Sequence, residues 1–496
     1  MKLVELLKNV EYELLAGDAN IEIKSLTSDS RKVGPGTAFV AIVGAVSDGH
    51  SYIPATLESG VSAIVVQEGA SFDLELIKDK ACLIQVKNSR LALAYMSQEY
   101  FGRPQDEMTI IGITGTKGKT TTTYMIREIL EACGHKTGLI GTIETIIGDV
   151  HTQSKNTTPE SYTLHETFRK MLDAGIKTVV MEVSSQALKL DRTAGIIFDY
   201  AIFTNLSPDH IGPNEHESFE EYMECKAMLF RQSKIGIFNA DDPYSKKMIE
   251  KASCQIQTYG LEHEADFKAS NMALYSSKGK IGLTFDCSCI EERLTLNMPG
   301  KFSVYNALCA ISVAKNLGAP DSMIVKGLAD SRVKGRIELV DISDRFSIII
   351  DYAHNAIALK SILETLRDYN PGRIVTIFGC GGNRSRERRF EMGEVSGQLS
   401  DFTIITSDNP RFEDPLDIIK DIKVGIEKTS KNYIEIPDRA DAVLYAIENA
   451  KEGDIIILAG KGHENYQEIK GVKHHMEEAE LIMDAVDKLK AKGINV

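Results

Sequence analysis

The fold is decided by the stretch Met108-Thr109-Ile110-Ile111-Gly112-Ile113-Thr114-Gly115-Thr116-Lys117-Gly118-Lys119-Thr120. An apolar strand runs into a glycine-rich turn, and a Lys-Thr pair opens a helix whose Ile126, Ile129 and Leu130 share one face. Backbone N–H groups in such a turn attract anions, as does the N-terminus of the following helix. Lys119 can reach the β- and γ-phosphates of ATP, and the Thr120 hydroxyl can bind Mg²⁺. The stretch therefore predicts an ATP site on a P-loop-type α/β domain.

One position departs from the strict P-loop pattern. The pattern G-x-x-x-x-G-K-[ST] requires glycine where this chain has Ile113, and Gly112 and Gly115 flank that position instead. A chance glycine-rich turn is the alternative. The strand before the loop and the helix after it, which we expect to end at Gly134, argue against that alternative.

Length and charge set the broad class of protein. A chain of 496 residues predicts about three domains. We place a smaller N-terminal α/β domain at 1–104, a central, mostly parallel P-loop-type sheet with helices at 105–338, and a C-terminal Rossmann-like α/β domain at 339–496. The net charge of −14 argues against a nucleic-acid partner, but not against small anionic substrates.

Other bulk features concern the compartment. The cysteines are scattered, the first residues resemble an amphipathic helix more than a signal peptide, and no apolar run reaches the length of about 18 residues that a membrane span needs. We therefore expect reduced thiols, a cytoplasmic location and no membrane partner. We also expect a monomer.

The third block repeats one pattern, in which an apolar run ends in a polar or glycine-rich cluster. The runs at 348–350, 374–378, 402–405 and 455–458 lead into the clusters Asp351-Tyr352-Ala353-His354, Gly379-Cys380-Gly381-Gly382, Thr406-Ser407-Asp408-Asn409-Pro410-Arg411 and Ala459-Gly460-Lys461-Gly462-His463-Glu464. Helical stretches between most of the runs complete the βα pattern of a parallel sheet. Ligands collect beyond the carboxyl ends of such strands, so we expect the clusters to line one edge.

The motifs along the chain resemble those of the Mur ligase family. In the family's order they are Ser28-Asp29-Ser30-Arg31, Asp48-Gly49-His50, the loop 114–120, Asn156-Thr157-Thr158-Pro159-Glu160, Glu182-Val183-Ser184-Ser185, Thr204-Asn205-Leu206-Ser207-Pro208-Asp209-His210, Gly335-Arg336-x-Glu338, Asp351-Tyr352-Ala353-His354 and Gly460-Lys461-Gly462-His463-Glu464. The resemblance spans all three blocks. It is greatest to the members that add the third residue of the peptidoglycan stem peptide to a UDP-N-acetylmuramoyl dipeptide.

The resemblance implies a reaction and a set of nucleotide contacts. ATP would phosphorylate the substrate carboxylate, and the amine of the incoming amino acid would attack the acyl phosphate. Lys119, the metal ions and Arg336 would neutralise the phosphoryl oxygens. Closure of the third block over the second would exclude water. The implied contacts to ATP are Gly115, Thr116, Lys117, Gly118, Lys119, Thr120, Thr121, Asn306, Arg336, Asp351 and His354.

The resemblance also implies metal-binding residues. Thr120, Glu182 and His210 would bind Mg²⁺, and Lys226 would be carbamylated (N6-carboxylysine) and help to place a second Mg²⁺. Oxygen ligands are typical of Mg²⁺, whereas a histidine ligand is less so. From the residues alone, His210 is better explained as a hydrogen-bonded turn histidine, and Lys226 as a solvated helix lysine; the resemblance reverses both interpretations.

The amino acid that is added depends on Asp408-Asn409-Pro410-Arg411, which resembles the motif of members that add meso-diaminopimelate. The distal end of that amino acid carries a carboxylate, which a guanidinium binds in bidentate fashion. Arg411 would supply the guanidinium, Arg384 a second positive charge, and Glu464 a partner for the ammonium, with polar contacts from Asp408, Asn409 and Gly460. A surface arginine after a turn proline is the alternative, and L-lysine is the alternative substrate.

The muramoyl dipeptide would contact two parts of the chain. The uridine end is assigned to Ser30 and Arg31, with Gly44 and the turn Asp48-Gly49-His50 as further candidates. Turn and cap roles are a close alternative for all of them. The sugar and peptide portion is assigned to Thr157, Thr158, Ser184 and Arg192. The chain departs from the family at Gln186, at Leu190, at Asn355-Ala356-Ile357 and in the longer segment 211–216, which resembles lysine-adding members.

Two other functions share some of these features. A folate-glutamylating ligase has the same loop and later motifs, but the first block and the Asp-Asn-Pro-Arg cluster argue against it. A catalytically silent, nucleotide-binding interaction protein is the alternative from a different class. The intact set of Lys119, Thr120, Glu182, His210 and Lys226 argues against such a loss of activity.

Overall fold

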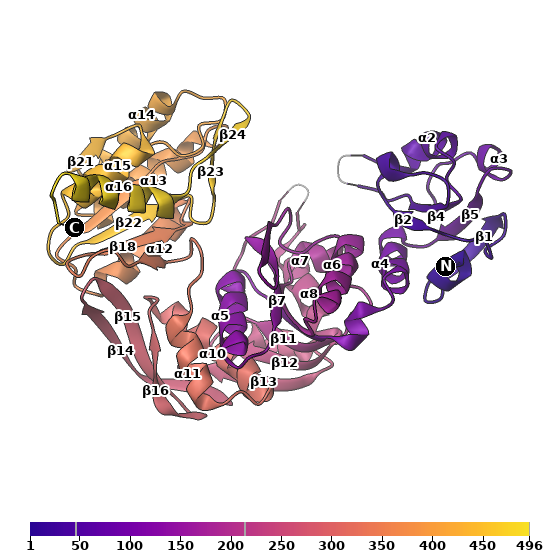
Figure 1. Ribbon diagram of the computed structural model, residues 1–496, viewed down its shortest axis with the longest axis horizontal. Coiled ribbons are helices and arrows are strands. Elements are labelled where there is room, and N and C mark those ends of the chain that lie inside the picture. The colour runs from indigo at the N-terminus through magenta and orange to yellow at the C-terminus, as the bar shows by residue number, and fades with distance from the viewer. Residues whose placement is uncertain (45–46, 213–214, 496) are drawn as a thin grey trace. The chain divides into compact units, whose positions relative to one another are not determined.

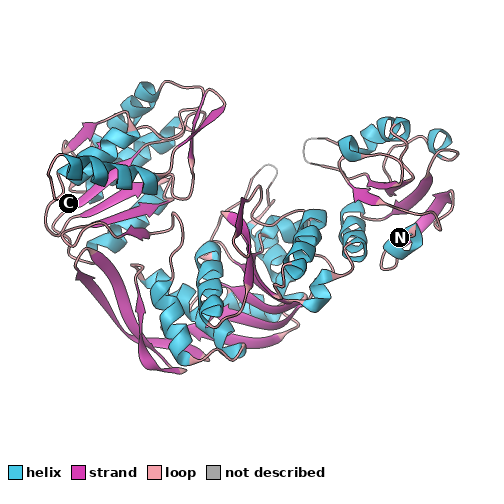
Figure 2. Ribbon diagram, in the orientation of Figure 1, coloured by secondary structure: helices cyan, strands magenta, loops and turns pink. Residues whose placement is uncertain are grey.

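The computed structural model describes residues 1–44, 47–212 and 215–495 (Figure 1). The chain forms two compact units, one comprising Met1–Phe267 with Cys309–Ala319 and the other Lys268–Leu308 with Pro320–Val496. Helices and strands are mixed throughout both units (Figure 2). The predicted α/β class is therefore confirmed. None of the described helices is long and apolar enough to cross a membrane.

The first sheet of unit 1 has the strand order β1-β5-β4-β3-β2 and is parallel except for β1. Its strands are β1 (Tyr12–Ala16), β2 (Ser25–Thr27), β3 (Thr37–Val40), β4 (Ala63–Gln67) and β5 (Cys82–Val86). Residues of β3, β4 and β5 are buried on both faces, as expected for inner parallel strands. The accompanying helices are α1 (Leu3–Leu6), α2 (Ile53–Glu58), α3 (Leu74–Ile77) and α4 (Ser89–Tyr100), with short 3₁₀ turns at η1 (Ser30–Lys32), η2 (Gly49–Tyr52) and η3 (Pro104–Glu107).

The second sheet of unit 1 contains the glycine-rich loop. Its order is β13-β12-β11-β6-β10-β7-β8-β9, parallel from β13 to β7 and antiparallel beyond. The strands are β6 (Thr109–Thr114), β7 (Thr137–Ile140), β8 (Glu144–Ile147), β9 (Val150–Gln153), β10 (Thr178–Glu182), β11 (Phe198–Phe203), β12 (Ser233–Asn239) and β13 (Gln255–Gly260). The helices are α5 (Lys119–Ala132), α6 (Ser161–Asp173), α7 (Ser185–Lys189), α8 (Phe219–Ala227) with η4 (Met228–Arg231), and α9 (Ser245–Glu250). Because β6 lies between β10 and β11, the loops after these three strands meet at one edge.

Unit 2 begins with antiparallel strands that the sequence did not predict. They are β14 (Phe267–Ser277), β15 (Lys280–Cys287) and β16 (Ile290–Leu296), and α11 (Asp321–Asp330) packs against β16. The helix α10 (Lys301–Asn316) is divided between the two units: its residues up to Leu308 belong to unit 2, and those from Cys309 belong to unit 1. Residues of β14 are mostly exposed, so this strand lacks the buried apolar run that marks the parallel strands.

The C-terminal sheet of unit 2 has the order β17-β18-β22-β19-β20-β21, parallel except for β17. Its strands are β17 (Glu338–Val340), β18 (Ser347–Asp351), β19 (Ile374–Phe378), β20 (Phe402–Ile405), β21 (Tyr433–Glu435) and β22 (Ile455–Ala459), with a separate hairpin of β23 (Tyr466–Ile469) and β24 (Val472–His475). The helices are α12 (Ala356–Arg367), α13 (Arg386–Leu399), α14 (Pro415–Ile426), α15 (Arg439–Glu448) and α16 (Glu478–Ala491). The predicted parallel runs are confirmed, and β18, β22, β19 and β20 are neighbours.

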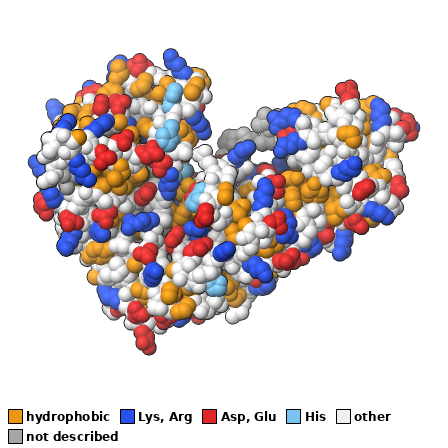
Figure 3. All heavy atoms as spheres, viewed as in Figure 1, with side chains coloured by type: hydrophobic (Ala, Val, Ile, Leu, Met, Phe, Trp, Pro, Cys, Tyr) orange, Lys and Arg blue, Asp and Glu red, His pale blue; other side chains and the backbone are white. Residues whose placement is uncertain are grey.

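The predicted domain boundaries stay a prediction. The backbone turns at the first predicted boundary. There, between α4 and η3, Gly102 and Arg103 have positive φ values of 72° and 52°. On the face shown in Figure 3, acidic and basic side chains are interspersed.

Candidate active site

The glycine-rich loop joins β6 to α5 as expected, and two amines converge on it. The Lys119 amine donates hydrogen bonds to the carbonyls of Gly115 (2.8 Å) and Thr116 (3.1 Å). Residues after β11 hold the loop, since Lys117 N–H donates to Asn205 Oδ1 (2.9 Å) and the Thr204 hydroxyl donates to the Lys117 carbonyl (2.7 Å). Gly118 caps α5 with a φ of 87°. The geometry is that of an anion-binding turn at a helix N-terminus.

Glu182 is buried and fully engaged by hydroxyl and amide donors. The Thr120 hydroxyl donates to Oε1 (3.0 Å), and Thr142 donates from its N–H to Oε1 (2.8 Å) and from its hydroxyl to Oε2 (3.0 Å). A buried carboxylate costs free energy unless it has such partners. The structure thus brings together Thr120 and Glu182, which offer hard oxygen ligands of the kind that Mg²⁺ prefers.

Lys226 is buried beside the loop and is not a solvated helix lysine. Its amine donates to the Gly115 carbonyl (2.9 Å) and lies 4.4 Å from the ring centroid of Tyr222. Burial, and then the positive charge of Lys119, hold the pKa of Lys226 well below its ordinary value. A lysine with a depressed pKa has more of its amine in the neutral, nucleophilic form.

His210 is not joined to this group. Its Nδ1 lies 3.1 Å from Glu215 Oε1, its side chain is 55% exposed, and its φ is 53°. Among the described residues, its contacts do not include Thr120 or Glu182. These contacts are those of a turn histidine. Pro213 and Asn214, in the longer segment 211–216, lie outside the described residues.

The predicted dipeptide residues form one network at the carboxyl end of β10. The Thr158 hydroxyl donates to the Glu182 carbonyl (3.0 Å) and accepts the Ser184 N–H (3.0 Å). Arg192 donates to the Thr158 carbonyl (2.9 Å) and forms an ion pair with Glu160 (2.6 Å). Thr157 is tied to the same group, because its hydroxyl lies 3.0 Å from that of Thr142.

The first block shows turn and cap contacts at its predicted positions. Asp29 caps η1, which starts at Ser30, and its pKa is lowered to about 2 by hydrogen bonds from Arg31. Buried His50 accepts the Gln67 N–H at Nε2 (3.0 Å), while Asp48 lies 2.6 Å from its Nδ1. These interactions explain the motif structurally and leave uridine binding as a prediction.

In unit 2, the six residues predicted to bind the amino acid line one cavity of about 140 Å³. Its walls come from the carboxyl ends of β18, β19, β20 and β22 and from the start of α13. The full lining is Tyr352, His354, Gly379, Cys380, Gly381, Arg384, Arg388, Asp408, Asn409, Arg411, Gly460 and Glu464. The expectation that the strand-end clusters share one edge is therefore confirmed.

The cavity carries charges of both signs. Arg411 donates to the Gly382 carbonyl (2.7 Å) and pairs with Glu468 (3.3 Å), and its Nη2 makes no hydrogen bond within the described chain. Arg384 forms no ion pair there either. Glu464 accepts from Asn409 Nδ2 (2.8 Å). Spare guanidinium donors and a carboxylate therefore line the same small space.

Two buried cations that support this cavity were not assigned as site residues from the sequence, although Lys461 lies in the motif Gly460-Lys461-Gly462-His463-Glu464. Lys461 is fully buried, 3.1 Å from Glu464 and 3.6 Å from Asp408. Arg439, also buried, donates to the carbonyls of Ser407 and Ala459 (both 3.2 Å) and to Glu478 (2.9 Å). The motif 460–464 was a signal that could have identified Lys461. Arg439 stands at a helix start, where a charged residue looks like a surface residue in a sequence, and no local pattern distinguishes it.

The remaining predicted nucleotide residues also lie in unit 2. The Arg336 guanidinium lies 4.7 Å from the ring centroid of Tyr352, and its buried Nε has no hydrogen-bond partner in the described structure. Burial raises the pKa of Asp351, against the opposing effect of Arg336. His354 contacts the Tyr352 carbonyl (2.9 Å). Asn306 lies in α10 and is buried.

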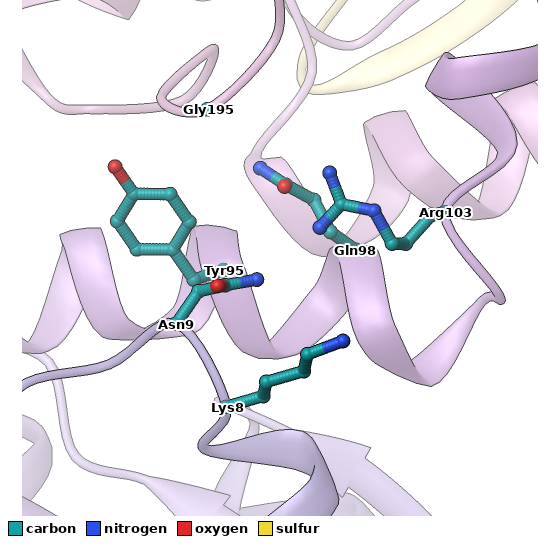
Figure 4. Close-up of a pocket in the computed structure, with 6 residues that line it drawn as sticks. All are labelled: Lys8, Asn9, Tyr95, Gln98, Arg103 and Gly195. Atoms are coloured by element: carbon teal, nitrogen blue, oxygen red, sulfur yellow. The ribbon is translucent and has the colours of Figure 1, made fainter.

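A second cavity lies away from every predicted site residue. It has a volume of about 470 Å³ and is lined by Lys8, Asn9, Tyr95, Gln98, Arg103 and Gly195. In Figure 4 the Tyr95 hydroxyl points toward Gly195, and the Lys8 amine toward the side of Gln98 and Arg103. The cavity lies where α4 approaches the residues that precede β11.

Known proteins resemble this chain along its whole length. Family models described as Mur ligase family, catalytic domain, Mur ligase middle domain, and Mur ligase, glutamate ligase domain match residues 22–101, 113–314 and 335–462. The UDP-N-acetylmuramoyl-L-alanyl-D-glutamate--2,6-diaminopimelate ligase of Clostridium perfringens (strain 13 / Type A) is 42% identical over 494 residues, covering 98% of this chain and 100% of that protein. The protein of the same name from Clostridium botulinum (strain ATCC 19397 / Type A) is 43% identical, covering 99% and 100%.

A solved structure of a UDP-N-acetylmuramoyl-L-alanyl-D-glutamate--2,6-diaminopimelate ligase is also similar, with a TM-score of 0.73, 28% identity and 99% coverage of both chains. The glycine-rich loop and the mostly parallel sheets define an α/β protein with a P-loop-type domain, and the family models and full-length relatives identify its class as a ligase. The chain belongs to the Mur ligase family. The resemblance stated from the sequence motifs is therefore confirmed.

Proposed function

We propose that this chain is a cytoplasmic, ATP-dependent amide ligase that adds meso-diaminopimelate to UDP-N-acetylmuramoyl-L-alanyl-D-glutamate in peptidoglycan synthesis. The cavity of unit 2 carries the proposal, because spare arginine donors and carboxylates line it together. The distal end of diaminopimelate offers a carboxylate and an ammonium, whereas lysine offers the ammonium alone. The function named for both relatives supports the same choice.

The charges of the cavity match that amino acid. Asp408 and Glu464 carry two negative charges and Lys461 one positive charge, which leaves an excess of one negative charge for an ammonium. Arg411 and Arg384 supply guanidinium donors for the distal carboxylate. Lysine has no distal carboxylate. When lysine occupies the cavity, these guanidinium donors would therefore be left without a hydrogen-bond partner, which costs affinity.

The phosphate groups of ATP are assigned to the loop Gly115–Thr121 in unit 1, with Lys119 as the charged donor. Thr120 and Glu182 would hold Mg²⁺, because both are oxygen donors already in hydrogen-bond contact. The ion would supply charge neutralisation for the phosphoryl oxygens. His210 would join these ligands only after leaving its contact with Glu215.

Lys226 is the proposed carbamylation site. A neutral amine adds to CO₂, forming an N–C bond and releasing one proton, which yields a carbamate. Burial and Lys119 favour the neutral amine, and after reaction Lys119 becomes a favourable neighbour for the new negative charge.

The reaction has two steps. A carboxylate oxygen of the dipeptide attacks the γ-phosphorus of ATP, and the β–γ anhydride bond breaks to give an acyl phosphate and ADP. The neutral amine of diaminopimelate then attacks the acyl carbon, phosphate leaves, and the amine proton is released. Positioning by Thr157, Thr158, Ser184 and Arg192 and charge neutralisation by Lys119 and Arg336 supply the catalysis. Ser30 would contact the uridine end, and Asn306, Asp351 and His354 the nucleotide.

The test is phosphate release with ATP, Mg²⁺ and the UDP-muramoyl dipeptide, with meso-diaminopimelate or L-lysine in parallel. We expect release only when an amino acid is present, and a kcat/KM for diaminopimelate about 10³-fold or more above that for lysine. Faster phosphate release with L-lysine would mean that L-lysine, and not meso-diaminopimelate, is the amino acid that is added. ATP binding without release under any combination would favour the silent nucleotide-binding protein.

A further inference from the structure

Three side chains of different types converge between α7 and α8, outside the residues assigned to the reaction. The ligand atoms of His216, Glu221 and Cys225 all lie within 4.8 Å of one another. Glu221 and Cys225 are one turn apart on α8, so they share a helix face, and His216 stands just before the helix. Their sequence spacing thus gathers a nitrogen, an oxygen and a sulfur donor.

The histidine is oriented with one nitrogen toward Glu221 and the other toward Ser185. His216 is fully buried, and its Nε2 lies 2.8 Å from the Ser185 hydroxyl at the start of α7. Its buried Nδ1 finds no hydrogen-bond partner in the part of the chain that the structure describes. The charged atom facing Nδ1 is Glu221 Oε2, at 3.7 Å. With the proton on Nε2 donated to Ser185, the lone pair of Nδ1 points into the cluster.

The spacing suits a tetrahedral ion. Donors that lie about 2.0–2.3 Å from Zn²⁺ are separated from each other by about 3.3–3.8 Å. The Nδ1–Oε2 distance of 3.7 Å already falls in that range. The three ligand atoms lie within 4.8 Å of one another, so the Cys225 thiol needs to move by only about 1 Å to reach the tetrahedral spacing. Cys225 is 6% exposed, so the ion would be largely shielded.

We propose that His216, Glu221 and Cys225 bind a soft or borderline divalent cation such as Zn²⁺. The thiol of Cys225 loses its proton as the sulfur–metal bond forms. A sulfur ligand selects against Mg²⁺, so this site differs in chemistry from the oxygen donors Thr120 and Glu182. Glu221 also pairs with Lys189 (2.7 Å), which would remain as an outer contact of the bound carboxylate.

Co²⁺ is the probe, because cobalt–thiolate bonds give a near-ultraviolet charge-transfer band. Metal-free full-length protein is titrated with CoCl₂, and ZnCl₂ affinity is measured by calorimetry, both with excess Mg²⁺ and without ATP or amino acid. We expect one equivalent to bind with a thiolate band that Zn²⁺ abolishes. Because no turnover is measured, failure of the ligase proposal would not affect this result.

Matched variants assign the band to its ligands. Cys225→Ser and His216→Gln should each weaken Zn²⁺ binding by about tenfold or more, and Cys225→Ser should abolish the band. Ser185→Ala should weaken binding without removing the band. Cys133→Ser, at a half-exposed cysteine after α5, should leave both unchanged.

A second pair of thiols requires its own control. Cys287 Sγ and Cys289 Sγ lie 3.5 Å apart. If the Cys287→Ser/Cys289→Ser protein lost the band and Cys225→Ser kept it, the proposal would be wrong, as it would be if the wild type bound no Co²⁺. Circular dichroism of each variant shows whether it folds, and a misfolded Cys225→Ser would be replaced by Cys225→Ala.

Discussion

The Lys226 amine lies within hydrogen-bond distance of the Gly115 carbonyl and is repelled by Lys119. Replacing it with arginine keeps a cation that cannot react with CO₂, and Lys226→Ala removes the nitrogen. We expect kcat to fall by about 10²-fold or more in both variants, since a charge at the reacting centre is lost. Phosphate release measures this, and a ¹³C carbamate signal after ¹³CO₂ labelling reports the modification.

Controls distinguish the carbamate from a structural role. Short carboxylic acids should partly restore activity to Lys226→Ala but not to Lys226→Arg. Lys246→Ala, an exposed lysine on α9, should behave as the wild type. Full activity of Lys226→Arg together with no labelled carbamate would contradict the assignment.

Arg411 tests the choice of amino acid. Its Nη1 and Nε are held by Gly382 and Glu468, which leaves Nη2 for the ligand. Arg411→Lys removes the forked donor geometry, so the KM for meso-diaminopimelate should rise by about 10²-fold, equivalent to about 2.7 kcal/mol. Steady-state kinetics measure this, with Arg345→Lys, an exposed arginine before β18, as the matched control. An unchanged KM would make Arg411 the surface arginine that the sequence left as an alternative.

Among the elements, α15 contacts two strand ends of the C-terminal sheet through its first residue, Arg439. Arg439 donates to the last residue of β22 and to Ser407 after β20, and these strands flank β19. Arg439→Met leaves buried Glu478 without its cation, which should cost about 3–5 kcal/mol. It should also raise the KM for diaminopimelate by about tenfold, because Asp408 and Gly460 follow the same strand ends.

The opposite edge of the sheet provides the comparison. Arg373 pairs with Asp454, whose side chain is 1% exposed, before β19 and β22 begin. Arg373→Met should lower the urea midpoint, followed by circular dichroism, without changing the KM. The double variant Arg439→Met/Glu478→Met should recover most of the lost stability. Equal effects of the two single variants on the KM would refute a role for Arg439 in positioning.

The parallel strands could be predicted because burial on both faces demands continuous apolar runs. β19 and β20 have the predicted bounds 374–378 and 402–405. The gathering of Arg384, Asp408 and Glu464 followed from topology, since parallel strands end at one edge. In contrast, β14 is mostly exposed and has no such run. Arg439 could not be found, because its role depends on contacts between elements far apart in the sequence.

At the scale of the whole molecule, the first and second sheets of unit 1 are connected by a region formed by α4, η3 and α6, which we call the joint. There α6 packs against α4 and η3, and Gln98 Nε2 donates to the Ala194 carbonyl (2.7 Å). Buried polar atoms without partners in the described structure collect in these elements, namely Gln105 Oε1 and both ring nitrogens of His165. Unsatisfied groups of this kind lower stability, and one of them, the His165 ring, can take up a proton.

His165 gives this joint a defined dependence on pH. Burial, with a further effect of Arg103 and against that of Asp106, lowers its pKa from 6.5 to about 3. The unfolded chain takes up a proton on this ring below pH 6.5, whereas the folded chain does not until about pH 3. The stability contributed by the neutral ring is therefore complete above pH 6.5 and falls by about 1.4 kcal/mol per pH unit as the pH drops toward 3.

Replacing the ring by an apolar side chain should remove that dependence. Between about pH 7.5 and pH 5, the wild type should lose about 2 kcal/mol more than His165→Leu, measured from urea unfolding at each pH. His151→Leu, an exposed histidine on β9, serves as the control and should follow the wild type. Parallel curves for the wild type and His165→Leu would mean that the ring is protonated or hydrated in the folded joint. The loss of acid stability would then have to come from carboxylates held by ion pairs, such as Glu160 with Arg192.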